Sequence, residues 1–263
     1  MRNVRWLQIG VGLAAAALVA GCGGATPEVG TPVTADSNQA ATTPTGGDPL
    51  QTVVAASEAT KAAGTARFEM SLEASQDGQT LTTTATGSQD FAQQLTEMDF
   101  TVSVPGTPPQ SMRMITAGTT MYQQLPGEER WFSMDLAALA AAGGGSFDPA
   151  QQLAMFEKAA KDVREVGPAE VRGVQTRHFE LTLDAQAMVD ATGGAATQSI
   201  TEPLPADVYI DGDGRLTRFE MEAKQAGLPS TSISMDLFDF GAPVSIQVPD
   251  SALVDSAPAG PPN

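Results

Sequence analysis

The most regular pattern in the chain is an alternation of apolar and polar side chains that begins near residue 65. Phe68, Met70 and Leu72, for example, alternate with charged or hydroxyl-bearing neighbours. Because the side chains of a β-strand point in turn to its two faces, such a segment is a strand with one apolar face. Further segments with strand character are 81–86, 97–104, 112–117, 120–125, 175–183, 207–211, 216–223 and 232–237. Turn-forming pairs such as Asp77-Gly78 separate several of them, so an antiparallel meander is predicted.

Three other segments show the three-to-four-residue spacing of helices. Asp48 followed by Pro49 is typical of a capped helix start, and Gly64 is a typical stop, so the first helix is expected over 48–64. A second Asp-Pro pair opens another predicted helix, whose apolar face carries Leu153, Phe156, Ala160 and Val163. A third helix is expected over 184–191.

The predicted sheet is too wide for these helices to cover. About ten strands at roughly 4.8 Å spacing make a sheet some 45 Å wide, whereas two or three helices of about 10 Å diameter cover at most 20–30 Å. The fold class is therefore α+β with apolar surface left over. Either the sheet closes on itself, or it curls part-way and leaves an apolar groove for a ligand or partner.

The first 22 residues have the three parts of a secretory signal. Arg2 and Arg5 give a positive start, and residues 7–20 form an apolar run of about 14 residues, short of the roughly 18 that a spanning helix needs. The sequence VAGC at 19–22 resembles the lipobox of bacterial lipoproteins, and Cys22 is the only cysteine. We expect cleavage before Cys22 and acylation of its thiol, which anchors the protein at the extracytoplasmic face of the cell membrane.

Composition divides the rest of the chain. Residues 22–47 are rich in Thr, Pro, Gly and Ala and hold no aromatic residue, which predicts a lipidated N-terminus and disordered tether after the signal peptide of 1–21. The folded domain is expected over 48–250, and 251–263 is expected to be a disordered tail.

The chain is strongly acidic. Its 14 basic and 31 acidic residues give a net charge of −17, and loss of the two arginines of the signal segment makes it −19. Nucleic acid is excluded as a partner, because phosphate neutralisation needs clustered Lys and Arg. The same charge opposes flat binding to an anionic membrane surface.

Residues that usually carry chemistry are scarce. His178 is the only histidine, alternation places it on a polar strand face with Glu180, and neither Cys nor a second His is available to complete a metal site or a catalytic triad. We expect a solvated strand histidine, no metal, no cofactor and no catalytic residue. The acidic loop 211–214 lacks the later ligands of a calcium loop and is expected to be a β-turn.

Methionine is unusually common on the predicted strands. Seven of the eleven lie there, mostly on the apolar side: Met70, Met98, Met112, Met114, Met121, Met221 and Met235. An unbranched, polarizable side chain suits a surface that adapts to variable partners, but it also fills gaps in an ordinary core. Both interpretations fit the pattern.

Segments 162–184, 204–216 and 237–249 resemble the actinobacterial lipoproteins related to LppX and LprG, which are similar in fold to the carrier LolA. The resemblance implies a wide antiparallel sheet curled into a half-barrel, with two or three helices covering its concave side. It also implies that this cavity binds acyl lipid or glycolipid. We expect the protein to be a monomer. The alternative is an envelope protein-interaction or regulatory module that uses the same groove without transporting lipid.

The apolar strand faces supply the candidate groove residues. These are Phe68, Met70, Leu72, Met98, Phe100, Met112, Met114, Met121, Phe179, Leu181, Phe219, Met221 and Met235. Arg177 falls on the same face as Phe179 and Leu181, and a buried guanidinium needs a partner. We expect it at the groove mouth, where it either pairs internally, reaches water, or meets the phosphate or sugar of a lipid headgroup.

Overall fold

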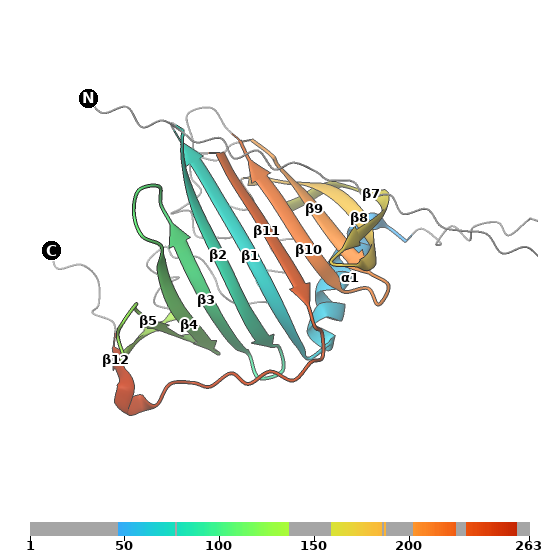
Figure 1. The fold of residues 1–263 in the computed structure, drawn as a ribbon. Coiled ribbons are helices and arrows are strands. Elements are labelled where there is room, and N and C mark those ends of the chain that lie inside the picture. Colours follow the sequence, from blue (N-terminus) through green and yellow to red (C-terminus); the bar gives the residue numbers. More distant parts are fainter. Residues whose placement is uncertain are drawn as a thin grey trace, which may run out of the picture. The chain divides into compact units, whose positions relative to one another are not determined.

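The computed structural model describes residues 47–76, 78–136, 159–185, 187, 202–224 and 230–256. They form one long helix, α1 (Pro49–Ala62), and twelve strands of a single sheet (Figure 1). The strands are β1 (Thr65–Gln76), β2 (Gln79–Asp90), β3 (Leu95–Ser103), β4 (Gln110–Ala117), β5 (Thr120–Gln124), β6 (Trp131–Asp135), β7 (Ala160–Val171), β8 (Val174–Leu183), β9 (Leu204–Asp211), β10 (Leu216–Ala223), β11 (Ser230–Phe238) and β12 (Val254–Ser256).

Two meanders lie side by side in this sheet. Its strand order is β12-β6-β5-β4-β3-β2-β1-β11-β10-β9-β8-β7, so β1 to β6 run outward from the centre and β7 to β11 run back toward it. The meanders meet where β1 pairs antiparallel with β11. All neighbouring strands are antiparallel except β12 and β6, which are parallel. The predicted antiparallel sheet is confirmed.

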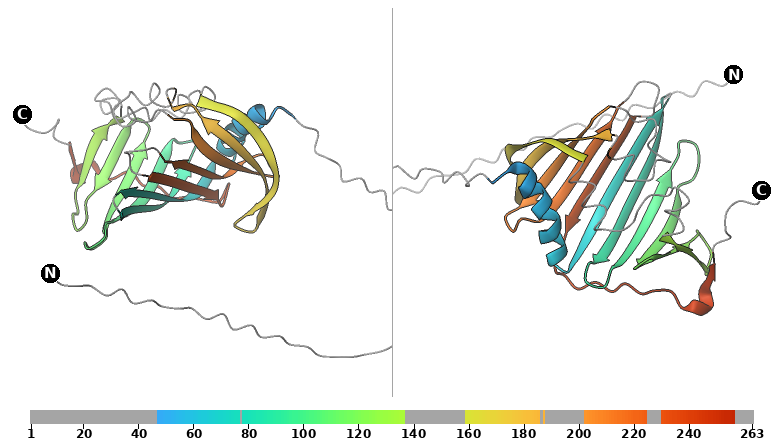
Figure 2. Two further views of the ribbon diagram at one scale, coloured as in Figure 1. Left: turned by 90° about the horizontal axis from the view of Figure 1, so that it is seen from above. Right: turned by 180° about the vertical axis from the view of Figure 1, so that it is seen from behind.

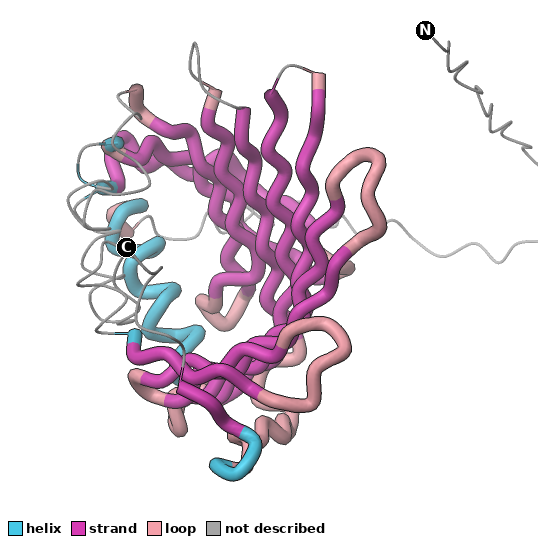
Figure 3. The backbone as a smooth tube through the Cα atoms, turned by 90° about the vertical axis from the view of Figure 1, so that its left-hand side faces the viewer, coloured by secondary structure: helices cyan, strands magenta, loops and turns pink. Residues whose placement is uncertain are grey.

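The sheet is wide, curled and open. Figures 2 and 3 show it bending around the side on which α1 lies. The helix packs against the β7–β10 part of the sheet and contacts none of β2 to β6 extensively. The described concave surface therefore has one half covered by a helix and one half without such a cover.

The first helix forms as the sequence predicts. The side chain of Asp48 caps it by accepting a hydrogen bond from the backbone N–H of Leu50 at 3.0 Å, and Pro49 occupies the first turn. Its buried face carries Val53, Ala56 and Thr60. The hydroxyl of Thr60 accepts a hydrogen bond at 2.9 Å from the backbone N–H of Leu216, which ties the helix directly to β10.

The predicted second helix is wrong at its C-terminal end. Ala160 and Val163 belong to strand β7, where Ala160 lies opposite Leu183. A β-bulge interrupts the register between Lys161 and Arg164. One extra residue in a strand returns side chains three positions apart to the same face, so the bulge imitates helical spacing. Residues 148–158 lie outside the described part of the chain.

Among the described residues, α1 is the one helix that covers the concave side, and the predicted two or three covering helices are not confirmed. At the predicted third helix, the carboxylate of Asp184 accepts a hydrogen bond at 3.0 Å from the backbone N–H of Ala187, and 188–191 lie outside the described residues. Within the described ranges, no helix is both long enough and apolar enough to cross a membrane.

The folded part extends past residue 250, so the prediction of a disordered tail from 251 onward is wrong for its first six residues. A 3-10 turn, Ser251–Leu253, leads into β12, which pairs with β6. The guanidinium of Arg130, just before β6, donates two hydrogen bonds of 2.5 Å to the carboxylate of Asp255. This ion pair and the strand pairing join segments more than a hundred residues apart, which local composition does not reveal.

Candidate functional site

The register of the sheet brings every candidate groove residue to one face. Residues directly opposite each other on paired strands share a face. One row therefore runs Met112, Phe100, Ala85, Met70, Met235, Phe219, Val208 and Phe179 across seven strand pairings. The rows through Phe68 and Leu72 carry the remaining candidates except Met121. Met121 lies opposite Thr116, which shares the face of Met114, so it belongs to the same face one row further along. The buried face of α1 packs against part of this same surface, so it is the concave one.

Burial divides these residues into two groups. Phe179, Leu181 and Phe68 are 0%, 4% and 8% exposed and belong to buried clusters, so they are core residues rather than free lining. Four more pack against those clusters: Phe219, Met221, Met98 and Met235. The other six are half-buried and belong to neither cluster of described residues. We call these six the open wall: Met70, Leu72, Phe100, Met112, Met114 and Met121.

A glycine that the sequence analysis did not single out shapes the border of this wall. Gly87 lies opposite Phe68 on β1 and Met98 on β3, and the Phe68 ring rests against it. A Cβ placed on Gly87 would lie 2.8 Å from Cε1 of Phe68, and closer still to Cζ and to the carbonyl oxygen of Glu97. Carbon atoms in contact normally stay about 3.5–4.0 Å apart. The ring can occupy this position only because residue 87 has no side chain.

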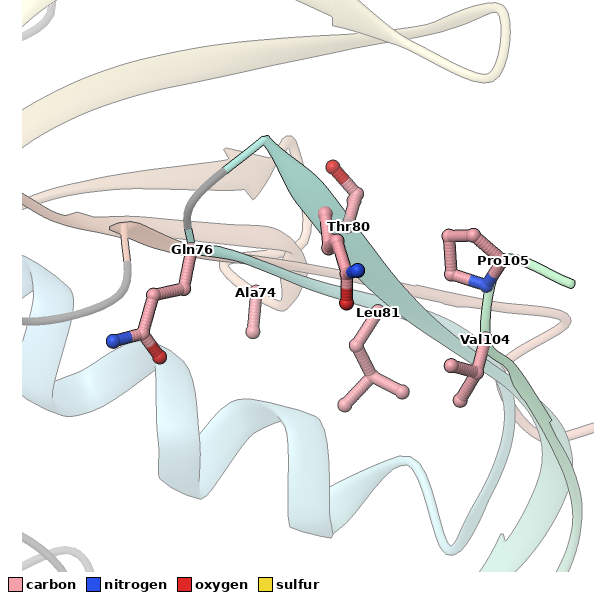
Figure 4. A pocket seen from close by; sticks show the side chains of 7 residues that line it. Ala74, Gln76, Thr80, Leu81, Val104 and Pro105 are labelled. Atoms are coloured by element: carbon pink, nitrogen blue, oxygen red, sulfur yellow. The ribbon is translucent and has the colours of Figure 1, made fainter. Parts of the chain in front are cut away.

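A pocket of about 450 Å³ continues the open wall to the end of its strands (Figure 4). Ala74 and Leu81, directly opposite each other on β1 and β2, contribute its apolar floor. Its other lining residues are Gln76, Gln79, Thr80, Val104 and Pro105. The volume falls within the roughly 300–1,000 Å³ typical of small-molecule sites. The concave face thus combines an apolar wall with a pocket that has a polar rim.

Arg177 is paired within the protein. Its Nε and Nη2 donate hydrogen bonds of 2.9 and 2.6 Å to the carboxylate of Glu165, and its guanidinium lies 5.0 Å from the centre of the Phe179 ring. The hydrogen bonds from Arg177 lower the pKa of Glu165, against the opposing effect of burial. Arg177 pairs with Ile210 beside the β9–β10 turn, at the opposite end of the strands from the pocket, a separation of roughly 30 Å along the sheet.

The expectation of a solvated His178 is wrong. Its side chain is 18% exposed, its Nε2 lies 2.5 Å from Oδ1 of Asp207, and its ring stacks on Tyr209 with centroids 4.5 Å apart. Burial, followed by the charge of Glu220, raises the pKa of Tyr209 to about 12. Alternation placed His178 correctly on the face opposite Phe179, but its partners come from β9, which local sequence does not indicate.

The acidic loop is a turn held by its own side chains. Oδ1 of Asp211 accepts hydrogen bonds from the backbone N–H groups of Asp213 and Arg215, and Oδ2 accepts one from Nε of Arg215. Asp211 is buried. Its carboxylate therefore stabilises the β9–β10 turn.

Comparison with known proteins identifies the family of this chain. The LppX_LprAFG lipoprotein family matches residues 48–246. The chain belongs to this family. LppX of Mycobacterium tuberculosis is similar with a TM-score of 0.53 and 17% identity, over 76% of this chain and 98% of its own. LprF of Mycobacterium bovis is similar with a TM-score of 0.50 and 18% identity, over 76% and 96%. No curated protein matches the sequence.

The family assignment confirms the resemblance seen in the sequence. At 17–18% identity, the two mycobacterial structures support the shared fold of a LppX_LprAFG protein and do not identify a ligand. The family match ends at residue 246, so β12 lies beyond it.

Proposed function

We propose that this LppX_LprAFG protein is a lipid-anchored carrier that holds acyl lipid or glycolipid against its open wall. The observation that carries the proposal is the register itself, which gathers six half-buried apolar side chains from four strands on the concave face, outside both buried clusters. An apolar surface of this kind needs an apolar partner. Methionine adapts to flexible acyl chains better than β-branched residues do.

Solvent exclusion is sufficient as a mechanism. Each methylene group removed from water contributes about 0.8 kcal/mol, so ten buried methylenes contribute roughly 8 kcal/mol. That corresponds to a dissociation constant of about 1 μM before the cost of ordering the chain is subtracted. A carrier that must also release its lipid benefits from affinity in this range, and no catalytic residue takes part.

The proposal also includes where the protein is anchored. Acylation of Cys22 and cleavage before it would leave the domain on a tether of about 25 residues, which spans roughly 25–30 Å as a flexible chain. One acyl chain gives marginal membrane binding, whereas two or more hold a protein stably. The domain would then stay within reach of lipids at the outer surface of the cell membrane.

The test narrows the groove at single positions. We expect Met70→Trp, Met112→Trp and Met114→Trp to reduce the lipid that co-purifies with the protein, measured by mass spectrometry, while the melting temperature changes little. A groove has room for the larger side chain, whereas a packed core does not.

Two control variants separate ligand loss from misfolding. Leu183→Trp adds the same bulk to a core position that is 1% exposed and should lower stability by about 1–3 kcal/mol. Thr84→Trp adds it to an exposed position of β2 and should change neither lipid nor stability. If the three methionine variants destabilise like Leu183→Trp and the unaltered protein carries no lipid, the wall is ordinary core.

The polar rim of the pocket supports a second candidate, a docking groove for a peptide or envelope protein. Gln76, Gln79 and Thr80 offer hydrogen bonds at the end of the wall, which acyl chains do not need. Two results together would favour this candidate. The purified protein would be free of lipid, and its amide exchange at β1 and β2 would slow when an envelope extract is added.

A further inference from the structure

The convex face carries a cluster of metal-ligating side chains on two adjacent strands. His178 and Glu180 are two residues apart on β8 and therefore share a face, and Glu180 lies directly opposite Asp207 on β9. A ring nitrogen of His178 and one carboxylate oxygen from each acid all lie within 4.8 Å of one another. Phe179 points to the other face and is fully buried there, so this cluster is separate from the groove.

The cluster is held in place yet open to solvent. The His178 ring lies parallel to Tyr209, with an angle of 3° between the two planes, and this stacking sets the direction of Nε2. The side chains of His178, Asp207 and Glu180 are 18%, 35% and 39% exposed. A strand pair fixes its donors more rigidly than a loop does, and partial exposure gives an ion a route of entry.

Negative charge accumulates at the same place. Glu180, Asp207 and Glu220 stand directly opposite one another on β8, β9 and β10, and carboxylates in such positions repel. Arg164 pairs with Glu180. Arg218 donates hydrogen bonds of 2.5 and 2.7 Å to Asp236 and lies 3.9 Å from Glu220. Among the described residues, the three carboxylates of this row are therefore matched by the guanidinium of Arg164 alone, because Arg218 donates its hydrogen bonds to Asp236 outside the row.

We propose that His178, Glu180 and Asp207 bind a divalent transition-metal ion of the zinc class. One imidazole and two carboxylates are a donor set suited to such ions, and three protein donors leave positions for water. At metal–donor distances of about 2.0–2.2 Å, two ligands of a tetrahedral ion stand roughly 3.4 Å apart. The present 2.5 Å contact between His178 and Asp207 would lengthen by about 1 Å, with the ion taking the place of their hydrogen bond.

Titration calorimetry with Zn²⁺ on the full chain tests the proposal. The expected result is saturable binding of one Zn²⁺ ion. His178→Gln and Asp207→Asn should each weaken this binding by more than about 10–100-fold, which is the loss seen when a residue that only supports a metal ligand is changed. Glu222→Gln is the matched control, because this exposed convex-face acid pairs with Lys224 outside the cluster. It should bind Zn²⁺ like the unaltered protein.

Arg164→Ala provides a test that misfolding cannot imitate. The Arg164 guanidinium competes with the ion for Glu180 and repels the ion. Removing this guanidinium should therefore tighten Zn²⁺ binding by roughly several-fold, a smaller change than the loss of a metal ligand. The absence of saturable Zn²⁺ binding by the unaltered protein would overturn the proposal, as would binding that survives His178→Gln. Neither outcome bears on the lipid groove, which is assayed separately on the other face.

Discussion

Replacing Gly87 with alanine tests whether the concave face is packed as described around Phe68. Two effects of opposite sign compete. Alanine is preferred over glycine within a strand by roughly 0.5–1 kcal/mol, because glycine loses more conformational freedom on folding. Against this, the new methyl group would lie 2.8 Å from Cε1 of Phe68 and closer to two further atoms. Overpacking of this kind costs about 1–3 kcal/mol.

Overpacking should win because one of the clashing atoms belongs to the backbone. The carbonyl oxygen of Glu97 on β3 cannot rotate away, and the Phe68 ring is confined by Ala66 and Leu237. Because the backbone clash puts overpacking in the upper part of its range, at about 2–3 kcal/mol, and alanine returns about 0.5–1 kcal/mol, we expect Gly87→Ala to lower the free energy of unfolding by about 1–2 kcal/mol. In a domain of this size, that lowers the melting temperature by roughly 2–8 °C.

Urea unfolding followed by circular dichroism measures this difference, and Gly212→Ala is the control. Nothing lies within 4 Å of a Cβ at Gly212, so that variant should be nearly neutral. A Gly87→Ala protein as stable as the unaltered one, or more stable, would refute the placement of the Phe68 ring. A loss equal to that of Gly212→Ala would refute it as well.

Three further predictions follow from the anchor, the Arg177 pair and the C-terminal strand. Cys22→Ala should give unprocessed or released protein, and normal cleavage with retained membrane binding, seen on immunoblots of cell fractions, would contradict acylation. Arg177→Ala should lower stability at pH 7 by about 0.5–1 kcal/mol, a figure discounted for solvent screening at a third-exposed pair. Because the pKa of Glu165 is lowered in the folded protein, this difference should be complete above the ordinary Glu range and disappear as pH falls through the lowered pKa, as denaturation measured at pH 7 and then at stepwise lower pH would show. Truncation after Pro249 removes Asp255, whose pKa Arg130 lowers, and should speed amide exchange in β6 at neutral pH but not in β10.

Alternation predicted most strands because it is a property of single segments. The faces of β1, β3 and β8 were all assigned correctly, since the pleat alone determines which side chains share a face. The start of α1 was equally local, because the Asp48 cap acts on the next two residues. Periodicity alone did not distinguish a sheet that closes on itself from one that curls part-way. The family resemblance predicted the part-way curl.

Features that depend on a partner far away in the chain were out of reach. The environment of His178 needs Asp207 and Tyr209 from another strand, and the end of the fold needs Arg130 to hold Asp255. The bulge in β7 imitated a helix because spacing alone does not distinguish the two. Gly87 showed no signal, since a glycine that makes room for an aromatic ring looks like any other glycine in a strand.

The seam between β1 and β11 has a consequence for how the protein is made. Its two strands come from opposite ends of the folded chain, and the Arg67–Asp239 ion pair at one end of the seam joins residues 172 positions apart. Long-range β pairing of this kind is slow, and until it forms an edge strand can pair with other chains. During synthesis, β1 to β6 therefore emerge well before β11 can join them. The open wall and the unpaired edge of β1 must be shielded from aggregation over that interval, so chaperone supply should limit the yield of this protein.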